Sequence, residues 1–353
     1  MKRVALILIS MSIIALGVAF FTFVLPFSTK EMIDESVFDI KTIPAIIEEN
    51  CIGFVIGSPD EISLISEIGG GWARPHPGPF AWGFIEPEKG TFDFSMADEY
   101  VLQAQENNVS LLGTIWPYAD WDQVVCHSTE CEVSTQDIFY PKEKGNMQSG
   151  IPKSRCAPCS YEDYTIFIGK IVERYDGDLV EDMPGLILPI KYWEVLNEPE
   201  MESDEMTFFK GTNEEYVSIL IETRNKIKDV CSNCNVLHAG VAGVQDYMLE
   251  YWGEIFDNVN NFDIANIHYI GGTDLSTLNV KDFKQLLTEK NISKPIWVTE
   301  AEYESSSEIV SSVEGALSAG ASKIFFTQFK IGEFGFPENG EYSEEYIGIA
   351  NLC

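Results

Sequence analysis

The chain contains 353 residues, which is enough for one large domain or two small ones. Hydrophobic residues make up 45% of it, including 22 Phe, 14 Tyr and 7 Trp, so the chain can fill a sizeable core and is neither disordered nor fibrous. The 56 acidic residues against 23 basic ones give a formal net charge of −33, which argues against a nucleic-acid binder and against docking on anionic lipid.

The N-terminus predicts export. Lys2 and Arg3 precede an apolar stretch, residues 4–27, that is long enough to span a bilayer as a helix. A cleavable signal peptide is the alternative, because residues 17–19 form a small-x-small site. An uncleaved single-pass anchor is favoured, since cleavage there would leave the apolar residues 20–25 on the mature protein. With either outcome the rest of the chain is predicted to be extracellular or at the cell surface, because the positive charges stay in the cytoplasm.

Cysteine usage agrees with export. Eight cysteines, an even number, predict up to four disulfides in an oxidising compartment. Four of them are clustered between residues 126 and 159, and at this spacing they could instead form a four-thiolate zinc site. Both interpretations stay open for the clustered cysteines Cys126, Cys131, Cys156 and Cys159.

From residue 51 onward, short apolar runs alternate with amphipathic stretches. We expect strands at 52–56, 71–84, 110–116, 191–196, 236–241, 262–269, 295–299 and 323–329. We expect helices at 59–68, 94–107, 161–175, 213–230, 245–256, 280–290 and 308–317, with Ser95 as an N-cap and a long loop at 119–160. Only residues 342–352 remain for a short eighth helix.

Strands that alternate with helices pair in parallel through right-handed crossovers. Eight such units fit a closed (β/α)8 TIM barrel, an α/β fold, better than an open sheet. No linker-like tract interrupts residues 51–353, so these form one domain after a signal peptide or transmembrane anchor at 1–30 and a lead-in segment at 31–50. We also expect a Cys51–Cys353 bond that closes the barrel and a local Cys231–Cys234 bond.

In such a barrel the C-terminal ends of the strands build the active site. Glu198 follows the fourth strand and Glu300 ends the seventh, so the two carboxylates face each other across the barrel mouth. A facing pair of carboxylates is what glycosidic bond cleavage requires. Glu194 has the same strand parity as Glu198, which points it into the lumen, where it can pair with a cation.

Residues 192–199, with the sequence YWEVLNEP, resemble the strand-four signature of glycoside hydrolase clan A, the 4/7 superfamily of TIM-barrel retaining β-glycosidases. Residues 295–301 resemble its strand-seven nucleophile segment, and residues 86–94 resemble the segment that follows strand two in several of its families. Asn-Glu-Pro recurs by chance, but its position on a fourth strand, with a second glutamate on a seventh, makes the combination specific.

The resemblance implies roles for individual residues. It implies that Glu198 is the catalytic acid/base, that Glu300 is the nucleophile, and that Asn197 binds the sugar 2-hydroxyl. Arg74 resembles the strand-two arginine that hydrogen-bonds the nucleophile. The remaining substrate-binding candidates at the strand ends are Trp116, His268, Tyr269 and Gln328. The last of these stands where the clan usually has a tryptophan under the sugar, so this chain departs from the pattern at strand eight.

The sequence thus predicts a retaining glycoside hydrolase that cleaves β-glycosidic bonds of an extracellular oligo- or polysaccharide by double displacement. A carbohydrate is the expected partner. No cofactor or metal is expected, because two carboxylates supply both proton transfer and nucleophile. A non-catalytic surface glycan-binding or structural barrel is one alternative, and a transglycosylase that uses the same residues is another. The sequence leaves the sugar, the linkage and the oligomeric state undetermined.

Overall fold

The computed structural model describes residues 50–133, 151–202, 207–270, 274–302 and 306–327. The predicted signal or anchor segment, the lead-in up to residue 49 and the short eighth helix lie outside these residues. No helix within the described part of the chain is long and apolar enough to cross a membrane.

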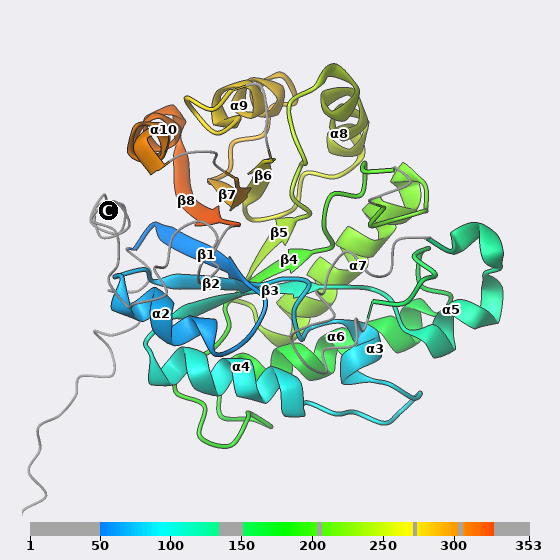
Figure 1. Ribbon diagram of the computed structural model, residues 1–353. Helices are drawn as coiled ribbons and strands as arrows, with labels where there is room; N and C mark the ends of the chain where they lie inside the picture. The colour runs from blue at the N-terminus through cyan, green and yellow to red at the C-terminus, as the bar shows by residue number, and fades with distance from the viewer. Residues whose placement is uncertain (1–49, 134–150, 203–206, 271–273, 303–305, 328–353) are drawn as a thin grey trace, which may run out of the picture. The chain divides into compact units, whose positions relative to one another are not determined.

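Eight parallel strands form the centre of the fold, and helices surround them (Figure 1). The strands are β1 (Ile52–Ile56), β2 (Trp72–Pro75), β3 (Ser110–Ile115), β4 (Tyr192–Val195), β5 (Asn235–His238), β6 (Ala265–Tyr269), β7 (Ile296–Ala301) and β8 (Ala321–Phe326). Their order is β5-β4-β3-β2-β1-β8-β7-β6, so the first strand pairs with the last. This is the predicted (β/α)8 arrangement.

The barrel is nearly closed, and its weakest junction lies between β5 and β6. There the two strands are joined by isolated parallel bridges, Leu237 with Ile264 and Val241 with Ile267, rather than by a continuous ladder. By contrast, β1 and β8 pair over three consecutive positions, beginning with Ile52 opposite Ile324.

The seven predicted helices are present, and two further helices were not predicted. They are α2 (Glu61–Glu67), α3 (Trp82–Ile85), α4 (Ser95–Glu106), α5 (Asp120–Cys126), α6 (Tyr161–Tyr175), α7 (Asn213–Val230), α8 (Asp246–Asn258), α9 (Val280–Glu289) and α10 (Ser306–Ala319), together with the 3-10 turn η1 (Thr129–Cys131). The bounds of α6 and α7 match the prediction because capping side chains fix their first turns. Ser160 caps α6, and Thr212 forms a capping box with Glu215 on α7.

Three local predictions were wrong. The strand expected at 71–84 ends at Pro75, because the prolines at 75, 77 and 79 cannot donate to a strand ladder, and its last residues belong to α3. The expected loop at 119–160 contains α5 and η1; α5 was missed because Val124 and Val125 are 76% and 74% exposed and break any amphipathic pattern. Ser95 is the first helical residue of α4 rather than its N-cap, and its backbone N–H donates to the Asp93 carboxylate at 2.9 Å.

The N-terminal end of the barrel is filled by aromatic side chains. The Trp72 ring lies 5.1 Å from that of Tyr192 and 5.4 Å from that of Trp297, measured between ring centroids. The ammonium of Lys323 lies 4.3 Å above the Trp72 ring and donates to the Asn50 carbonyl. This layer closes the end of the lumen opposite the strand ends that carry Glu198 and Glu300.

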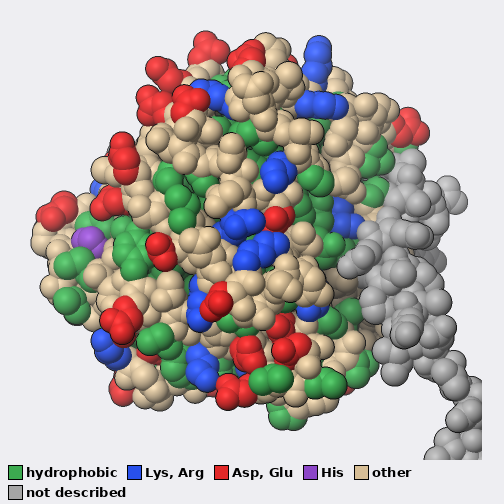
Figure 2. Space-filling model, turned by 180° about the vertical axis from the view of Figure 1, so that it is seen from behind, with side chains coloured by type: hydrophobic (Ala, Val, Ile, Leu, Met, Phe, Trp, Pro, Cys, Tyr) green, Lys and Arg blue, Asp and Glu red, His purple; other side chains and the backbone are tan. Residues whose placement is uncertain are grey.

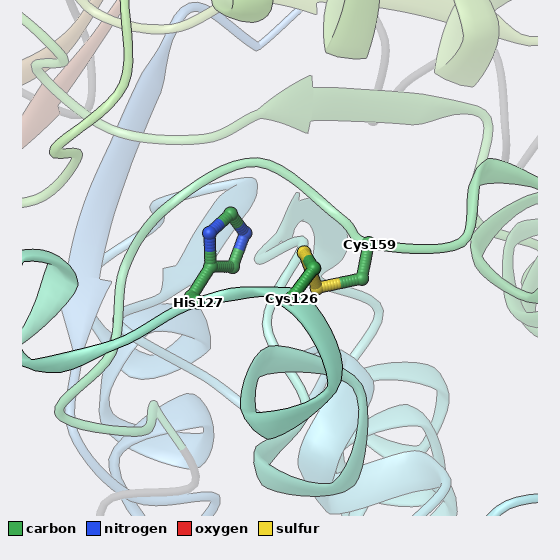
Figure 3. Close-up of side chains that lie close together, drawn as sticks. All are labelled: Cys126, His127 and Cys159. Atoms are coloured by element: carbon green, nitrogen blue, oxygen red, sulfur yellow. A yellow bond between two sulfur atoms is a disulfide. The ribbon is translucent and has the colours of Figure 1, made fainter.

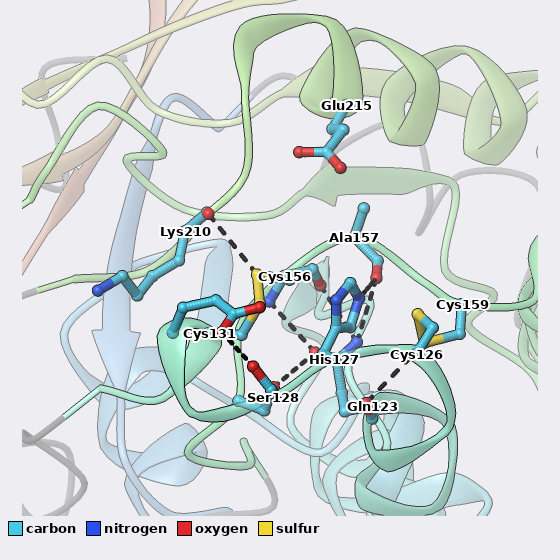
Figure 4. The surroundings of a disulfide bond; sticks show 12 residues. Gln123, Cys126, His127, Ser128, Cys131, Cys156, Ala157, Cys159, Lys210 and Glu215 are labelled. Carbon is cyan, nitrogen blue, oxygen red and sulfur yellow. Dashed lines mark hydrogen bonds between the residues drawn. A yellow bond between two sulfur atoms is a disulfide. The ribbon is translucent and has the colours of Figure 1, made fainter.

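The clustered cysteines form two disulfides, Cys126–Cys159 and Cys131–Cys156. Their sulfurs are therefore not available as thiolate ligands, which settles the open choice against a zinc site. The His127 ring lies beside the first of these bonds and contacts the Ala157 carbonyl through Nε2 at 2.7 Å (Figures 3 and 4). Together the two bonds tie α5 and η1 to the segment that leads into α6.

The predicted Cys231–Cys234 bond is confirmed, with a Cα–Cα distance of 5.3 Å. Cys51 is disulfide-bonded, but Cys353 lies outside the described residues, so the Cys51–Cys353 pairing stays a prediction.

The surface charge is unevenly distributed. On the face shown in Figure 2, basic side chains gather near the middle and acidic ones lie mainly toward the edge. Several acidic residues are neutralised by direct contacts; Asp263, for example, lies 2.9 Å from the Lys228 ammonium.

Candidate active site

Arg74 on β2 organises the charged centre of the barrel. Its side chain is fully buried, and its three nitrogens reach three different partners. Nε donates to Glu194 at 2.6 Å, Nη1 to Glu300 at 2.7 Å and Nη2 to Asn197 at 2.8 Å. The expected contact of Arg74 with Glu300 is present, and the cation expected for the inward-facing Glu194 is this same guanidinium.

Glu194 accepts hydrogen bonds on both carboxylate oxygens. Oε2 accepts from Arg74 and from the Thr114 hydroxyl at 2.8 Å, and Oε1 accepts from the Asn266 amide at 2.6 Å. Because each of these partners is a donor and one is a cation, Glu194 is held as a carboxylate.

Glu198 lies in a loop of unusual backbone conformation directly after β4. Leu196 has φ 71° and Glu198 has φ 36°, both in the left-handed region that residues with bulky side chains rarely adopt. Such strain costs about 1–3 kcal/mol per residue and recurs at functional sites. This backbone conformation directs the Glu198 side chain toward β6, where its Oε1 lies 2.6 Å from Nδ1 of His268.

The second carboxylate, Glu300, comes from β7 and is 8% exposed, whereas Glu198 is 1% exposed. One oxygen of each carboxylate and one ring nitrogen of His268 lie within 4.8 Å of one another. Both Glu300 and its neighbour Thr299 reach inward, although consecutive strand residues normally face opposite sides. A register shift between β7 and β8 at this point accounts for the exception.

The two carboxyl groups differ in their surroundings. Burial raises the pKa of Glu198 to about 8, against an opposing effect of the Arg74 charge. Burial also raises the pKa of Glu300, but there the nearby His268 and Arg74 oppose the rise. Burial lowers the pKa of His268 to about 4, which makes its ring neutral near pH 7.

Aromatic side chains form one wall beside the carboxylates. Trp116 is fully buried and donates from Nε1 to the Pro77 carbonyl at 2.6 Å. Its ring lies 5.6 Å from that of His76 and 5.9 Å from that of Phe208, measured between centroids. His76 Nδ1 in turn lies 3.9 Å from Glu300, and burial lowers the His76 pKa well below its usual value.

The structure brings most of the predicted site residues together. Arg74, Asn197, Glu198, His268 and Glu300 are in direct or shared contact; Trp116 lies beside His76, and Tyr269 follows His268 on β6 with 7% of its surface exposed. Gln328 lies outside the described residues.

Sequence reasoning missed Asn266 and Thr114, which hydrogen-bond Glu194, and it gave no role to the strand-end residue Thr299, which hydrogen-bonds His268. The available signal was strand parity for Asn266, which shares a face with His268.

Glu198, His268 and Glu300 are also residue types that ligate metals. The Arg74 guanidinium, 2.7 Å from Glu300, already supplies the positive charge at this place and would repel a cation. The arrangement is therefore better suited to acid–base and nucleophilic chemistry than to metal binding.

The sequence matches no protein-family model and no curated protein. Solved structures with a similar fold include a glucosidase from Croceicoccus marinus, with 12% sequence identity and a TM-score of 0.57 over 79% of this chain. This chain spans only 60% of the length of that glucosidase.

Two xylanases give similar results. A psychrophilic glycoside hydrolase family 10 endo-β-1,4-xylanase has 13% identity and a TM-score of 0.56, over 89% of this chain and all of the xylanase. Xylanase XynB from Paenibacillus barcinonensis has 12% identity and a TM-score of 0.50, over 82% of this chain and 86% of XynB. The chain therefore has the parallel eight-stranded barrel fold of these glycoside hydrolases.

Proposed function

We propose that the protein is a retaining glycoside hydrolase that cleaves β-glycosidic bonds. The observation that carries the proposal is the pair Glu198 and Glu300, in which one oxygen of each carboxylate lies within 4.8 Å of the other while Arg74 donates to Glu300. Retaining enzymes place their two carboxyl groups about 5–5.5 Å apart, whereas inverting enzymes need roughly 6.5–9.5 Å to admit a water molecule.

Each residue has a distinct role in the proposed reaction. The Glu300 carboxylate attacks the anomeric carbon while the glycosidic bond breaks, and the leaving oxygen takes the proton of Glu198. Water then attacks the same carbon, gives its proton to Glu198 and releases Glu300 as a carboxylate. Asn197, held by Arg74, is placed to bind the sugar hydroxyl beside the reacting carbon.

The substrate is proposed to be an extracellular oligo- or polysaccharide. The three described disulfides support an oxidising compartment, as does the apolar N-terminal segment. Trp116 and Tyr269 are the aromatic candidates for contact with sugar rings, and Gln328 is proposed to contact the sugar from strand eight.

Replacing Glu198 by Ala should separate the two steps. With a dinitrophenyl β-glycoside the first step needs no proton, so the glycosyl-enzyme should accumulate and appear as added mass on the protein. Azide needs no general base, so it should restore turnover and give a glycosyl azide of retained configuration.

The matched control for this experiment is Glu99→Ala on the exposed face of α4, which should behave like the natural chain. Unchanged hydrolysis of poor leaving groups by Glu198→Ala would contradict the acid/base role. Failure of the natural chain on all β-glycosides would favour the non-catalytic alternative, and transfer to added sugars instead of water would favour a transglycosylase.

The pH dependence follows from the two carboxyl groups. Since the pKa of Glu198 is raised to about 8, Glu198 carries its proton below that pH. We expect kcat/KM for a substrate with a poor leaving group to fall as the pH rises through about 8. A dinitrophenyl glycoside should lack this alkaline fall in its first step, as pre-steady-state release of dinitrophenol would show. An alkaline fall of equal position and size for both substrates would assign the titration to another group.

A further inference from the structure

Four hydrogen bonds link the acid/base candidate to the charged centre of the barrel, one after another. Glu198 contacts Nδ1 of His268 at 2.6 Å, and Nε2 of the same ring lies 2.9 Å from the Thr299 hydroxyl. The Thr299 hydroxyl lies 2.7 Å from Oδ1 of Asn266, whose Nδ2 lies 2.6 Å from Glu194. All five side chains are buried.

The donor and the acceptor of each hydrogen bond can be assigned by starting from Glu194. Glu194 is a carboxylate paired with Arg74, so it only accepts, and the Asn266 amide must turn its NH2 group toward it. Oδ1 of Asn266 then faces Thr299 and can only accept, so the single hydroxyl proton of Thr299 points at Asn266. The alternative acceptor for that proton, Glu194 Oε1 at 3.3 Å, leads to the same result for the next bond.

Because the Thr299 hydroxyl proton is already donated to Asn266 or to Glu194, the Thr299 oxygen must accept a hydrogen bond from His268. The proton of the neutral imidazole therefore lies on Nε2, and Nδ1 presents a bare lone pair to Glu198. A bare nitrogen 2.6 Å from a carboxylate oxygen would be repulsive, whereas a protonated Glu198 can donate to it. We propose that His268, oriented by Thr299 and Asn266, is a positioning residue that keeps Glu198 protonated in the resting enzyme.

This inference rests on the proposed function, in which Glu198 is the general acid, and adds how its proton is held between turnovers. When substrate binds, the glycosidic oxygen replaces Nδ1 as the acceptor of that proton. Once the proton has left, the carboxylate of Glu198 faces the lone pair of His268. That repulsion makes Glu198 a stronger base toward the water of the second step.

The hydrogen-bond chain passes through the Asn266 amide, which cannot pass a proton on to Glu194. His268 therefore holds the proton of Glu198 without becoming a proton source itself. Its ring is faced by ionisable groups from β2, β4, β5 and β7 and the loops after them, namely Arg74, His76, Glu194, Glu198, His238 and Glu300. Glu200, two residues after Glu198, also interacts electrostatically with it.

The test compares Thr299→Val with Thr299→Ser in the full chain. Valine keeps the shape but removes the acceptor for Nε2–H, so the ring proton should move to Nδ1 and donate to an ionised Glu198. Nitrogen-15 NMR of histidine-labelled protein reads the tautomer directly, and the chain has only four histidines, which His268→Asn assigns.

In the natural chain we expect a protonated Nε2 and an unprotonated Nδ1. In Thr299→Val we expect a population with the proton on Nδ1, and the alkaline limb of kcat/KM for poor leaving groups should move down by about one pH unit or more. Thr299→Ser keeps the hydroxyl and should restore both the tautomer and the position of the limb.

A proton on Nδ1 in the natural chain would overturn the inference, and so would an unchanged tautomer and pH limb in Thr299→Val. The spectrum of the natural chain decides the matter even if the valine variant does not fold. The NMR spectrum can be read whether or not the protein is active. An inactive protein with the proton on Nε2 would contradict the proposed glycosidase function but support the hydrogen-bond chain. An active protein with the proton on Nδ1 would support the function and contradict the hydrogen-bond chain.

Discussion

Glu300→Ala is expected to lower kcat/KM for β-glycosides by roughly four to six orders of magnitude, because no other group replaces a covalent nucleophile. The Arg74 guanidinium, 2.7 Å from Glu300, is a cation and cannot act as the nucleophile. In the proposed reaction Glu198 protonates the leaving oxygen and does not attack the anomeric carbon. No glycosyl-enzyme adduct should form with any substrate, including dinitrophenyl glycosides, as intact-protein mass spectrometry will show.

A small anion should distinguish this loss from misfolding. Azide can enter the space that the Glu300 side chain leaves and attack the anomeric carbon directly, which gives a glycosyl azide of inverted configuration. Glu198→Ala gives the opposite outcome, retention, so the two variants serve as mutual controls. An adduct on Glu300→Ala, or a retained product with azide, would show that another residue is the nucleophile.

Arg74→Met is expected to lower the free energy of unfolding by about 3–5 kcal/mol. The side chain is fully buried and compensates two buried carboxylates, Glu194 and Glu300, which the variant leaves without a cation. Denaturant titration at neutral pH measures the loss. Adding Glu194→Gln to Arg74→Met should recover part of it, because one of the two stranded charges is then removed.

The matched control is Arg174→Met. Arg174 also makes two contacts with a carboxylate, that of Asp98, but its side chain is 22% exposed and water can replace the partner. The loss there should stay near or below about 1 kcal/mol. Equal losses for the two arginines would mean that the contacts of Arg74 carry no special weight in the fold.

The barrel could be predicted from the sequence because the hydrophobic residues of its strands and helices recur with the period of those elements. The charged centre was accessible for the same reason: strand ends give Arg74, Asn197, Glu198 and Glu300, and strand parity gives Glu194. Helix α5 was not accessible, because two exposed valines hide its period.

The contacts of His268 could not be read from the sequence. Thr299 resembles an ordinary strand threonine, and it reaches the lumen beside Glu300 only because the pairing of β7 with β8 shifts there. The left-handed loop that turns Glu198 toward His268 contains no glycine, the residue that would indicate this conformation in the sequence. Both features arise from tertiary packing, and sequence periodicity does not record them.

The weak junction between β5 and β6 is a seam in the ring of strands, which stays continuous from β5 through β1 and β8 to β6. Arg74 and Glu198 come from β2 and the loop after β4, on one side of the seam, whereas His268 and Glu300 come from β6 and β7 on the other. The Arg74–Glu300 and Glu198–His268 contacts therefore connect the two sides of this seam, where backbone hydrogen bonds are few. Heat that loosens this junction separates acid from nucleophile directly, so inactivation can precede the melting of the surrounding helices.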